Sequence, residues 1–169
     1  MSLLLKTNVS SAACPDLLNY QFKKLHSSET LNLCNAAEAK AVLFINTASN
    51  CGFTGQFKDL EVLSQRYMDQ GLVLIGFPSN DFRQEEKEEE DVAKVCYVYY
   101  GVSFDMPAPI SVKGKDAHPL FQSLAKATKK PRWNFNKYLY DPKIGTVTHY
   151  GAMTKPLSKK LINDIEALL

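Results

Sequence analysis

Apolar residues in this chain follow two alternating patterns, short continuous runs and repeats at helical spacing. Residues 41–45 and 72–77 are continuous apolar runs, which are typical of strands buried on both faces of a parallel sheet. Between them, apolar residues within 60–68 recur at helical spacing, and Gly71 marks a plausible end of that helix. Strand, helix and strand in this order predict a βαβ unit.

The remaining pattern predicts further elements on both sides of this unit. They are a hairpin of 20–22 and 31–33, a helix 88–100, a short strand 110–112, a helix from Pro119 to about Ala127, a hairpin of 138–140 and 146–150, and a C-terminal helix after Pro156. Together they predict an α/β domain with a thioredoxin-like fold, in which helices flank a central mixed sheet and a β-hairpin lies near the N-terminus. We expect one domain over residues 1–169, with 1–15 as an N-terminal extension.

Composition narrows the functional classes without naming one. The chain has 169 residues, of which 45% are hydrophobic and 22% charged, and its formal net charge of +2 is too small to indicate a nucleic-acid surface or a membrane patch. No apolar run is long enough to span a bilayer. The acidic run 85–90 near the start of a predicted helix is interpreted as a solvated segment that favours the helix dipole.

The four cysteines are Cys14, Cys34, Cys51 and Cys96. Four are too few for a disulfide scaffold, and the absence of a C-x-x-C pair argues against a zinc site or a thioredoxin-type redox pair. For each one, the plain alternative to a functional role is a small, buried, hydrophobic residue.

Cys51 has a position that suits a reactive thiol. It follows the strand predicted at 41–45 and precedes a helix, so we expect it at the carboxyl end of a strand, where ligands gather in open α/β sheets. A helix N-terminus favours the thiolate, which is the nucleophilic form of cysteine. Gly52 and Gly55 on its C-terminal side permit unusual backbone angles and a close approach.

Three motifs resemble those of the glutathione peroxidase family. Residues 46–54, which contain Cys51, resemble its nucleophile motif; 76–82 followed by Gln84 resemble its second motif; and 133–139 resemble its third. They occur in the family's order and at similar spacing, and the resemblance extends over about residues 31–169.

The resemblance implies which side chains surround the sulfur. The family's glutamine, tryptophan and asparagine correspond here to Gln84, Trp133 and Asn134. Each carries an N–H that is able to stabilise a thiolate and the charge that develops on a departing oxygen. The stretch 81–86 departs from the family pattern, because it is one residue short and lacks a proline, so Gln56 is kept as an alternative amide donor.

The resemblance also implies a reaction. Cys51 reduces hydrogen peroxide or an organic hydroperoxide and becomes a sulfenic acid, which a second thiol then resolves. That thiol is either glutathione or Cys96, which resembles the resolving cysteine of one subgroup; with Cys96, the reductant is expected to be a thioredoxin-like protein. No metal or nucleotide cofactor is expected. A non-catalytic redox sensor and a disulfide oxidoreductase remain alternatives.

Two further expectations concern assembly and compartment. The short stretch between Ala127 and Trp133 resembles the monomeric branch of the family, so we expect a monomer or a weak dimer. The N-terminal hairpin is expected to bring Cys14 within reach of Cys34, and a disulfide there would favour an exported, periplasmic location. Small residues at 10–13 resemble the region after a signal cleavage site, although no intact signal is present. Two free thiols in a cytoplasmic protein are the alternative.

Overall fold

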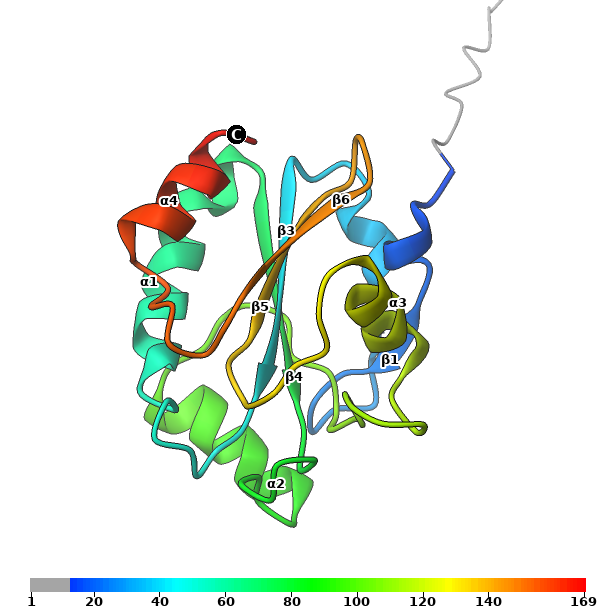
Figure 1. The fold of residues 1–169 in the computed structure, drawn as a ribbon. Helices are drawn as coiled ribbons and strands as arrows, with labels where there is room; N and C mark the ends of the chain where they lie inside the picture. The colour runs from blue at the N-terminus through cyan, green and yellow to red at the C-terminus, as the bar shows by residue number, and fades with distance from the viewer. Residues whose placement is uncertain (1–12) are drawn as a thin grey trace, which may run out of the picture.

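A computed structural model describes residues 13–169 of the chain (Figure 1). Most of the predicted extension 1–15 and of the small-residue stretch 10–13 therefore lies outside the described residues. The central sheet has four strands in the order β4-β3-β5-β6. Their bounds are β3 Ala41–Thr47, β4 Leu72–Pro78, β5 Lys137–Asp141 and β6 Thr146–Tyr150.

The sheet is mixed, as the sequence predicts. β3 and β4 run parallel, with Ala41 opposite Leu72, and β3 pairs antiparallel with β5 on its other edge. Every residue of β3 is buried, which explains its continuous apolar sequence. The connection between β3 and β4 contains α1 (Gln56–Tyr67), which ends close to Gly71, a residue in the left-handed conformation.

Helices cover both faces of the sheet (Figure 1). On one face, α1 and α4 (Lys159–Glu166) bury Leu60, Leu161 and Ile165 against Leu43 and other strand residues. On the other face, α3 (Pro119–Ala127) packs Leu120, Phe121 and Leu124 against residues of β3 such as Val42 and Phe44. The alternation of side chains along β3 thus supplies both cores.

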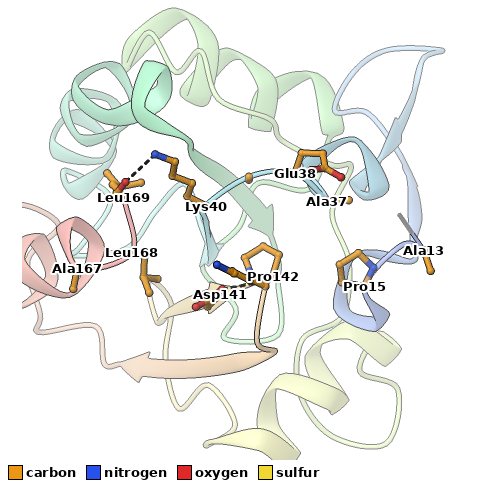
Figure 2. Close-up of a pocket in the computed structure, with 12 residues that line it drawn as sticks. Ala13, Pro15, Ala37, Glu38, Lys40, Asp141, Pro142, Ala167, Leu168 and Leu169 are labelled. Carbon is orange, nitrogen blue, oxygen red and sulfur yellow. Dashed lines mark hydrogen bonds between the residues drawn. The ribbon is translucent and has the colours of Figure 1, made fainter. Parts of the chain in front are cut away.

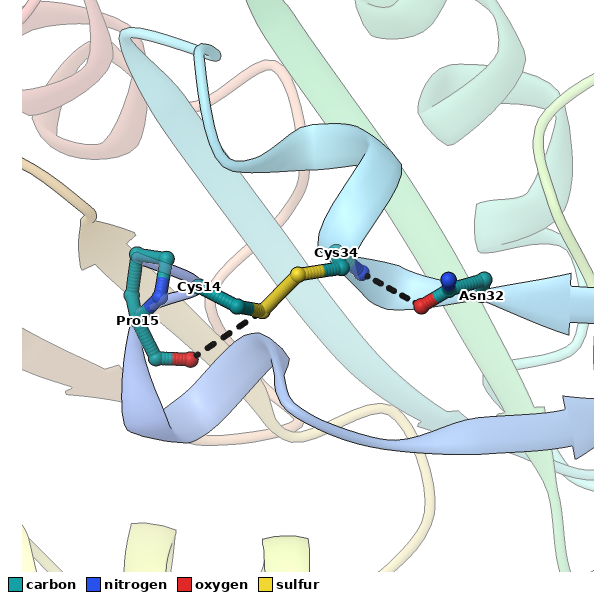
Figure 3. Close-up of a disulfide and its surroundings, with 4 residues drawn as sticks. All are labelled: Cys14, Pro15, Asn32 and Cys34. Carbon is teal, nitrogen blue, oxygen red and sulfur yellow. Dashed lines mark hydrogen bonds between the residues drawn. A yellow bond between two sulfur atoms is a disulfide. The ribbon is translucent and has the colours of Figure 1, made fainter. Parts of the chain in front are cut away.

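The N-terminal hairpin is present, with its strands at β1 (Gln21–Lys23) and β2 (Thr30–Asn32). A 3-10 turn, Leu33–Ala36, follows β2, and Asn32 caps it by accepting a hydrogen bond from Cys34 N at 3.0 Å. A disulfide joins Cys34 to Cys14, with 5.6 Å between the two Cα atoms (Figure 3). The structure therefore contains the bond that the hairpin predicts.

The strand predicted at 110–112 is wrong. Its backbone N–H groups are used outside any ladder, because the Asp81 carboxylate accepts from Val112 N at 2.6 Å and from Lys113 N at 3.0 Å. Ile110 N donates to Pro78 O at the end of β4. The Asp81 carboxylate, in the loop after β4, thus accepts the hydrogen bonds that the backbone of a neighbouring strand would otherwise accept.

The helix predicted at 88–100 forms in two parts. α2 (Glu89–Ala93) is α-helical, and Lys94–Tyr99 continues it as a π-helical turn, closed by a bond from Tyr100 N to Val95 O. The acidic run before it is only partly solvated, since Glu85 is buried. Its burial corrects the interpretation of that run as a uniformly solvated segment.

Removal of the Cys14–Cys34 disulfide should lower the free energy of unfolding. The bond closes a loop with a sequence separation of 20 residues. Replacing both cysteines with serine should cost about 3 kcal/mol, because the unfolded chain regains the freedom that the bond removes. Urea denaturation of the variant and of wild type measures this difference, and wild type in excess dithiothreitol should match the variant. Superimposable curves for variant and oxidised wild type would contradict it.

Candidate functional site

Cys51 lies in the turn between β3 and α1 and is half-buried. Its backbone N–H donates to Thr54 Oγ1 at 2.9 Å, and Thr54 Oγ1 donates in turn to Ala48 O at 2.9 Å. The hydroxyl of Thr54 therefore closes the turn. Thr54 stands where a C-x-x-C pair would place its second thiol, so this position has a structural use in place of a redox one.

A backbone N–H of the turn itself is directed at the Cys51 sulfur. Phe53 N donates to Cys51 Sγ at 3.4 Å. α1 begins only at Gln56, five residues after the cysteine, so the turn contributes more directly than the helix end that the sequence suggests. A backbone N–H directed at sulfur stabilises the thiolate over the thiol.

Gln84 is fixed to the Cys51 turn despite the shortened segment around it. Its backbone carbonyl accepts from Asn50 N at 2.8 Å, and its side-chain Oε1 accepts from Asn134 Nδ2 at 3.2 Å. Since Oε1 is engaged, the Nε2 group is the free, donating end of this amide. Arg83, the residue before Gln84, adopts a left-handed φ of 59°, which is uncommon for a residue other than glycine.

Asn134 is fully buried and Trp133 is partly exposed. The Trp133 ring packs on Phe82 with 5.5 Å between centroids, and its carbonyl accepts from Asn46 Nδ2 at 2.9 Å. Asn134 Oδ1 is buried without a hydrogen-bond partner among the described residues. The loop of Trp133 and Asn134 is thus bonded to the end of β3 and to Gln84. The Gln84 segment is in turn bonded to the Cys51 turn.

Asn46, for which the sequence predicts no role, is hydrogen-bonded to the loop that carries Trp133 and Asn134. This buried residue near the end of β3 accepts at its backbone O from Phe135 N at 2.6 Å and at Oδ1 from Asn136 N at 3.1 Å. Phe135, like Arg83, has a left-handed φ of 59°. Of the three described non-glycine residues with a left-handed φ, His26, Arg83 and Phe135, the last two adjoin a predicted site residue. Such conformations are often found at functional sites.

Glu85 is the second residue that the sequence analysis missed. Its carboxylate accepts from Ser49 N at 3.1 Å and from Glu86 N at 2.9 Å, which fixes the Gln84 segment to the turn that carries Cys51. Burial raises the pKa of this carboxyl group. In a run of six charged residues, a single buried member has no distinguishing signal in the sequence.

Cys96 lies in the π-helical turn and is buried in the core between the sheet and α1, a core that Cys51 also contacts. Burial, aided by the charge of Glu85, raises the pKa of the Cys96 thiol to about 12. In this structure Cys96 is therefore a neutral thiol.

Gln56 does not serve as the alternative donor. Its Nε2 donates to Ala152 O at 2.8 Å, and its Oε1 accepts from Lys137 Nζ at 2.6 Å. Both ends of the amide are therefore occupied by groups other than Cys51.

A cavity of about 640 Å³ lies apart from these residues (Figure 2). It is bordered by Lys40, Asp141 and the C-terminal Leu169, at the end of the sheet opposite to the Cys51 turn. Lys40 Nζ donates to Leu169 O there at 2.8 Å. Within residues 13–169 there is no cluster of metal-ligating side chains, and no helix is long and apolar enough to cross a membrane.

Comparison with known proteins gives a consistent result. The family model for glutathione peroxidase matches residues 17–125. A glutathione peroxidase homolog, BsaA of Halalkalibacterium halodurans, is 43% identical over 136 residues, which cover 77% of this chain and 85% of the relative. The glutathione peroxidase-like peroxiredoxin gpx1 of Schizosaccharomyces pombe is 42% identical over 139 residues, which cover 78% and 86%.

Solved structures confirm the thioredoxin-like fold. The crystal structure of Trgpx in apo form matches with a TM-score of 0.68 at 29% identity and covers 93% of this chain and 97% of its own. A secreted Mycobacterium tuberculosis disulfide oxidoreductase matches with a TM-score of 0.61, covering 90% and 98%, but at 13% identity this likeness concerns the fold alone.

Replacing Asn134 with alanine should slow the reaction of Cys51 with hydrogen peroxide by about tenfold or more. The variant loses the Asn134 Nδ2–Gln84 Oε1 bond that orients the Gln84 amide. A misplaced Gln84 amide then loses its own hydrogen bond to the charge at the reacting atoms, and such bonds contribute about 1.5–3 kcal/mol. Stopped-flow fluorescence of Trp133, the only tryptophan, measures the rate. The matched control is Asn163→Ala on the exposed surface of α4, which should react like wild type. Equal rates for the two variants would exclude Asn134 from the site.

Proposed function

We propose that this chain, which belongs to the glutathione peroxidase family and is a thiol peroxidase, attacks hydroperoxides with Cys51 and resolves the product with Cys96. The observation that supports Cys51 most strongly is the N–H that Phe53 directs at its sulfur, in a turn bordered by Gln84 and Asn134. Of the four cysteines, Cys14 and Cys34 are joined and Cys96 is buried, so Cys51 is the thiol that a peroxide reaches first.

The first step oxidises Cys51 and reduces the peroxide. The thiolate attacks one peroxide oxygen, so an S–O bond forms, the O–O bond breaks, and the alkoxide or hydroxide leaves and takes a proton. Cys51 becomes a sulfenic acid, and the products are an alcohol or water. The amide N–H groups of Gln84 and Asn134 and the indole N–H of Trp133 are suited to stabilising charge on the departing oxygen.

The second step joins Cys51 to Cys96. The Cys96 sulfur attacks the sulfenic sulfur, an S–S bond forms, and the hydroxyl group leaves with the Cys96 proton as water. Because Cys96 is 1% exposed, its helical turn must open first. π-Helical turns are rare and are frequent at functional sites, and the neighbouring Val98 and Tyr99 are 70% and 62% exposed, so few packing contacts hold the outer face of this turn.

A thioredoxin-like protein is the proposed reductant. Its dithiol reduces the Cys51–Cys96 disulfide, and both protein thiols are regenerated. Two relatives, the fission-yeast gpx1 and the Saccharomyces cerevisiae HYR1 proteins, are named glutathione peroxidase-like peroxiredoxins. An intramolecular disulfide also leaves no sulfenic acid for glutathione to attack.

We further propose an exported location in an oxidising compartment such as the periplasm. The Cys14–Cys34 disulfide supports this proposal, because structural disulfides persist in such compartments. A monomer or weak dimer is proposed as well, since only a few residues separate α3 from Trp133. Such a short loop leaves the site accessible to a protein reductant.

Substitutions of the two free cysteines separate the steps. Cys51→Ser should reduce peroxide turnover by about 10³-fold or more, because serine is a far weaker nucleophile. Cys96→Ser should consume about one equivalent of peroxide and then stop when thioredoxin is the reductant. A steady-state assay with thioredoxin and glutathione in parallel measures both effects. Undiminished turnover of Cys51→Ser would contradict the first assignment, and full thioredoxin-dependent turnover of Cys96→Ser would contradict the second.

A further inference from the structure

Lys137 is a fully buried lysine at the start of β5, with no exposed surface. No ion pair within residues 13–169 includes it. Replacing a buried charge with an apolar side chain of similar size is often neutral or stabilising, so packing alone does not explain an amine here. Burial also lowers the pKa of Lys137 to about 7, which shows how poorly this site suits a charge.

Its amine joins three segments of the chain. Nζ donates to Gln56 Oε1 at 2.6 Å, to Thr154 O at 2.7 Å and to Ala152 O at 3.5 Å. Three acceptors match the three donors of an ammonium group. Gln56 Nε2 adds a bond to Ala152 O, so β5, the start of α1 and the loop after β6 are connected through one buried amine.

The first residue of α1, Gln56, is hydrogen-bonded to Phe53, whose N–H points at the Cys51 sulfur. Gln56 N donates to Phe53 O at 2.9 Å, while Phe53 N donates to Cys51 Sγ at 3.4 Å. Gly55, the N-cap residue, has no side chain to cap the helix. Two consecutive hydrogen bonds thus connect Gln56 through Phe53 to the Cys51 sulfur.

We propose that Lys137 is a positioning residue for Cys51. By holding Gln56, it keeps the Phe53 N–H directed at the sulfur, and this hydrogen bond makes the thiol more reactive. The inference rests on the proposed role of Cys51, but it concerns the reactivity of this thiol toward any electrophile. A lysine that only fills the core would affect folding and leave the thiol unchanged.

The test uses the pH dependence of Cys51 alkylation by iodoacetamide, in a Cys96→Ser background where Cys51 is the remaining free thiol. At pH 6, Cys51 in the Lys137→Met variant should be alkylated about tenfold more slowly than in the Cys96→Ser parent, because the sulfur loses the hydrogen bond from Phe53 N. Gln56→Ala should have a similar effect, and the double variant should be no slower than either single one, because both remove the same link.

Leu139→Ala is the matched control. Leu139 lies two residues further along β5 in the core beneath α1, so this variant loses stability without touching the link. Its alkylation profile should equal that of wild type.

A folded Lys137→Met variant with the wild-type profile would overturn the proposal, as would additive effects in the double variant. If Lys137→Met does not fold, Gln56→Ala decides alone, and an unchanged profile for it overturns the proposal. Alkylation needs no peroxide. If the unmutated protein does not consume peroxide, the proposed function is contradicted. Slower alkylation of Cys51 in the Lys137→Met and Gln56→Ala variants would still support this inference.

Discussion

The candidate site depends on the hydrogen bonds that Asn46 makes with the segment before β5. Asn46 is the penultimate residue of β3, and its backbone and side chain bond Trp133, Phe135 and Asn136 at distances of 2.6 to 3.3 Å. Asn46, Phe135 and Asn136 are buried, so their polar groups need partners within the protein. The bonds place the Trp133–Asn134 loop beside the turn that begins where β3 ends.

A second loop completes the arrangement through the same kind of contact. The segment after β4 bonds the Cys51 turn through the Gln84 carbonyl and the Glu85 carboxylate, and it bonds the third loop through the Gln84 amide. The loop after β4 is thus hydrogen-bonded both to the turn that carries Cys51 and to the loop that carries Trp133 and Asn134.

The sequence predicted the sheet and the helix after Cys51 because continuous apolar runs and helical repeats reflect burial directly. The strand at 110–112 was wrong because a distant carboxylate, Asp81, satisfies that backbone, and no local pattern reveals such a partner. The motifs predicted Cys51, Gln84, Trp133 and Asn134 as site residues, and hydrogen bonds connect the loop of Gln84 to the Cys51 turn and to the loop of Asn134. Asn46, Glu85 and Lys137 escaped notice because a polar residue inside a strand or a charged run gives no sign of its burial.

The most direct test of this account is to identify the oxidised residues by mass spectrometry after one equivalent of hydrogen peroxide. The account predicts a linked Cys51–Cys96 peptide in wild type, and a dimedone adduct on Cys51 when Cys96 is serine. The Cys14–Cys34 peptide should be the same before and after oxidation. An adduct on Cys96 in place of Cys51, or no modification of Cys51 at all, would contradict the central claim that Cys51 is the residue that attacks the peroxide.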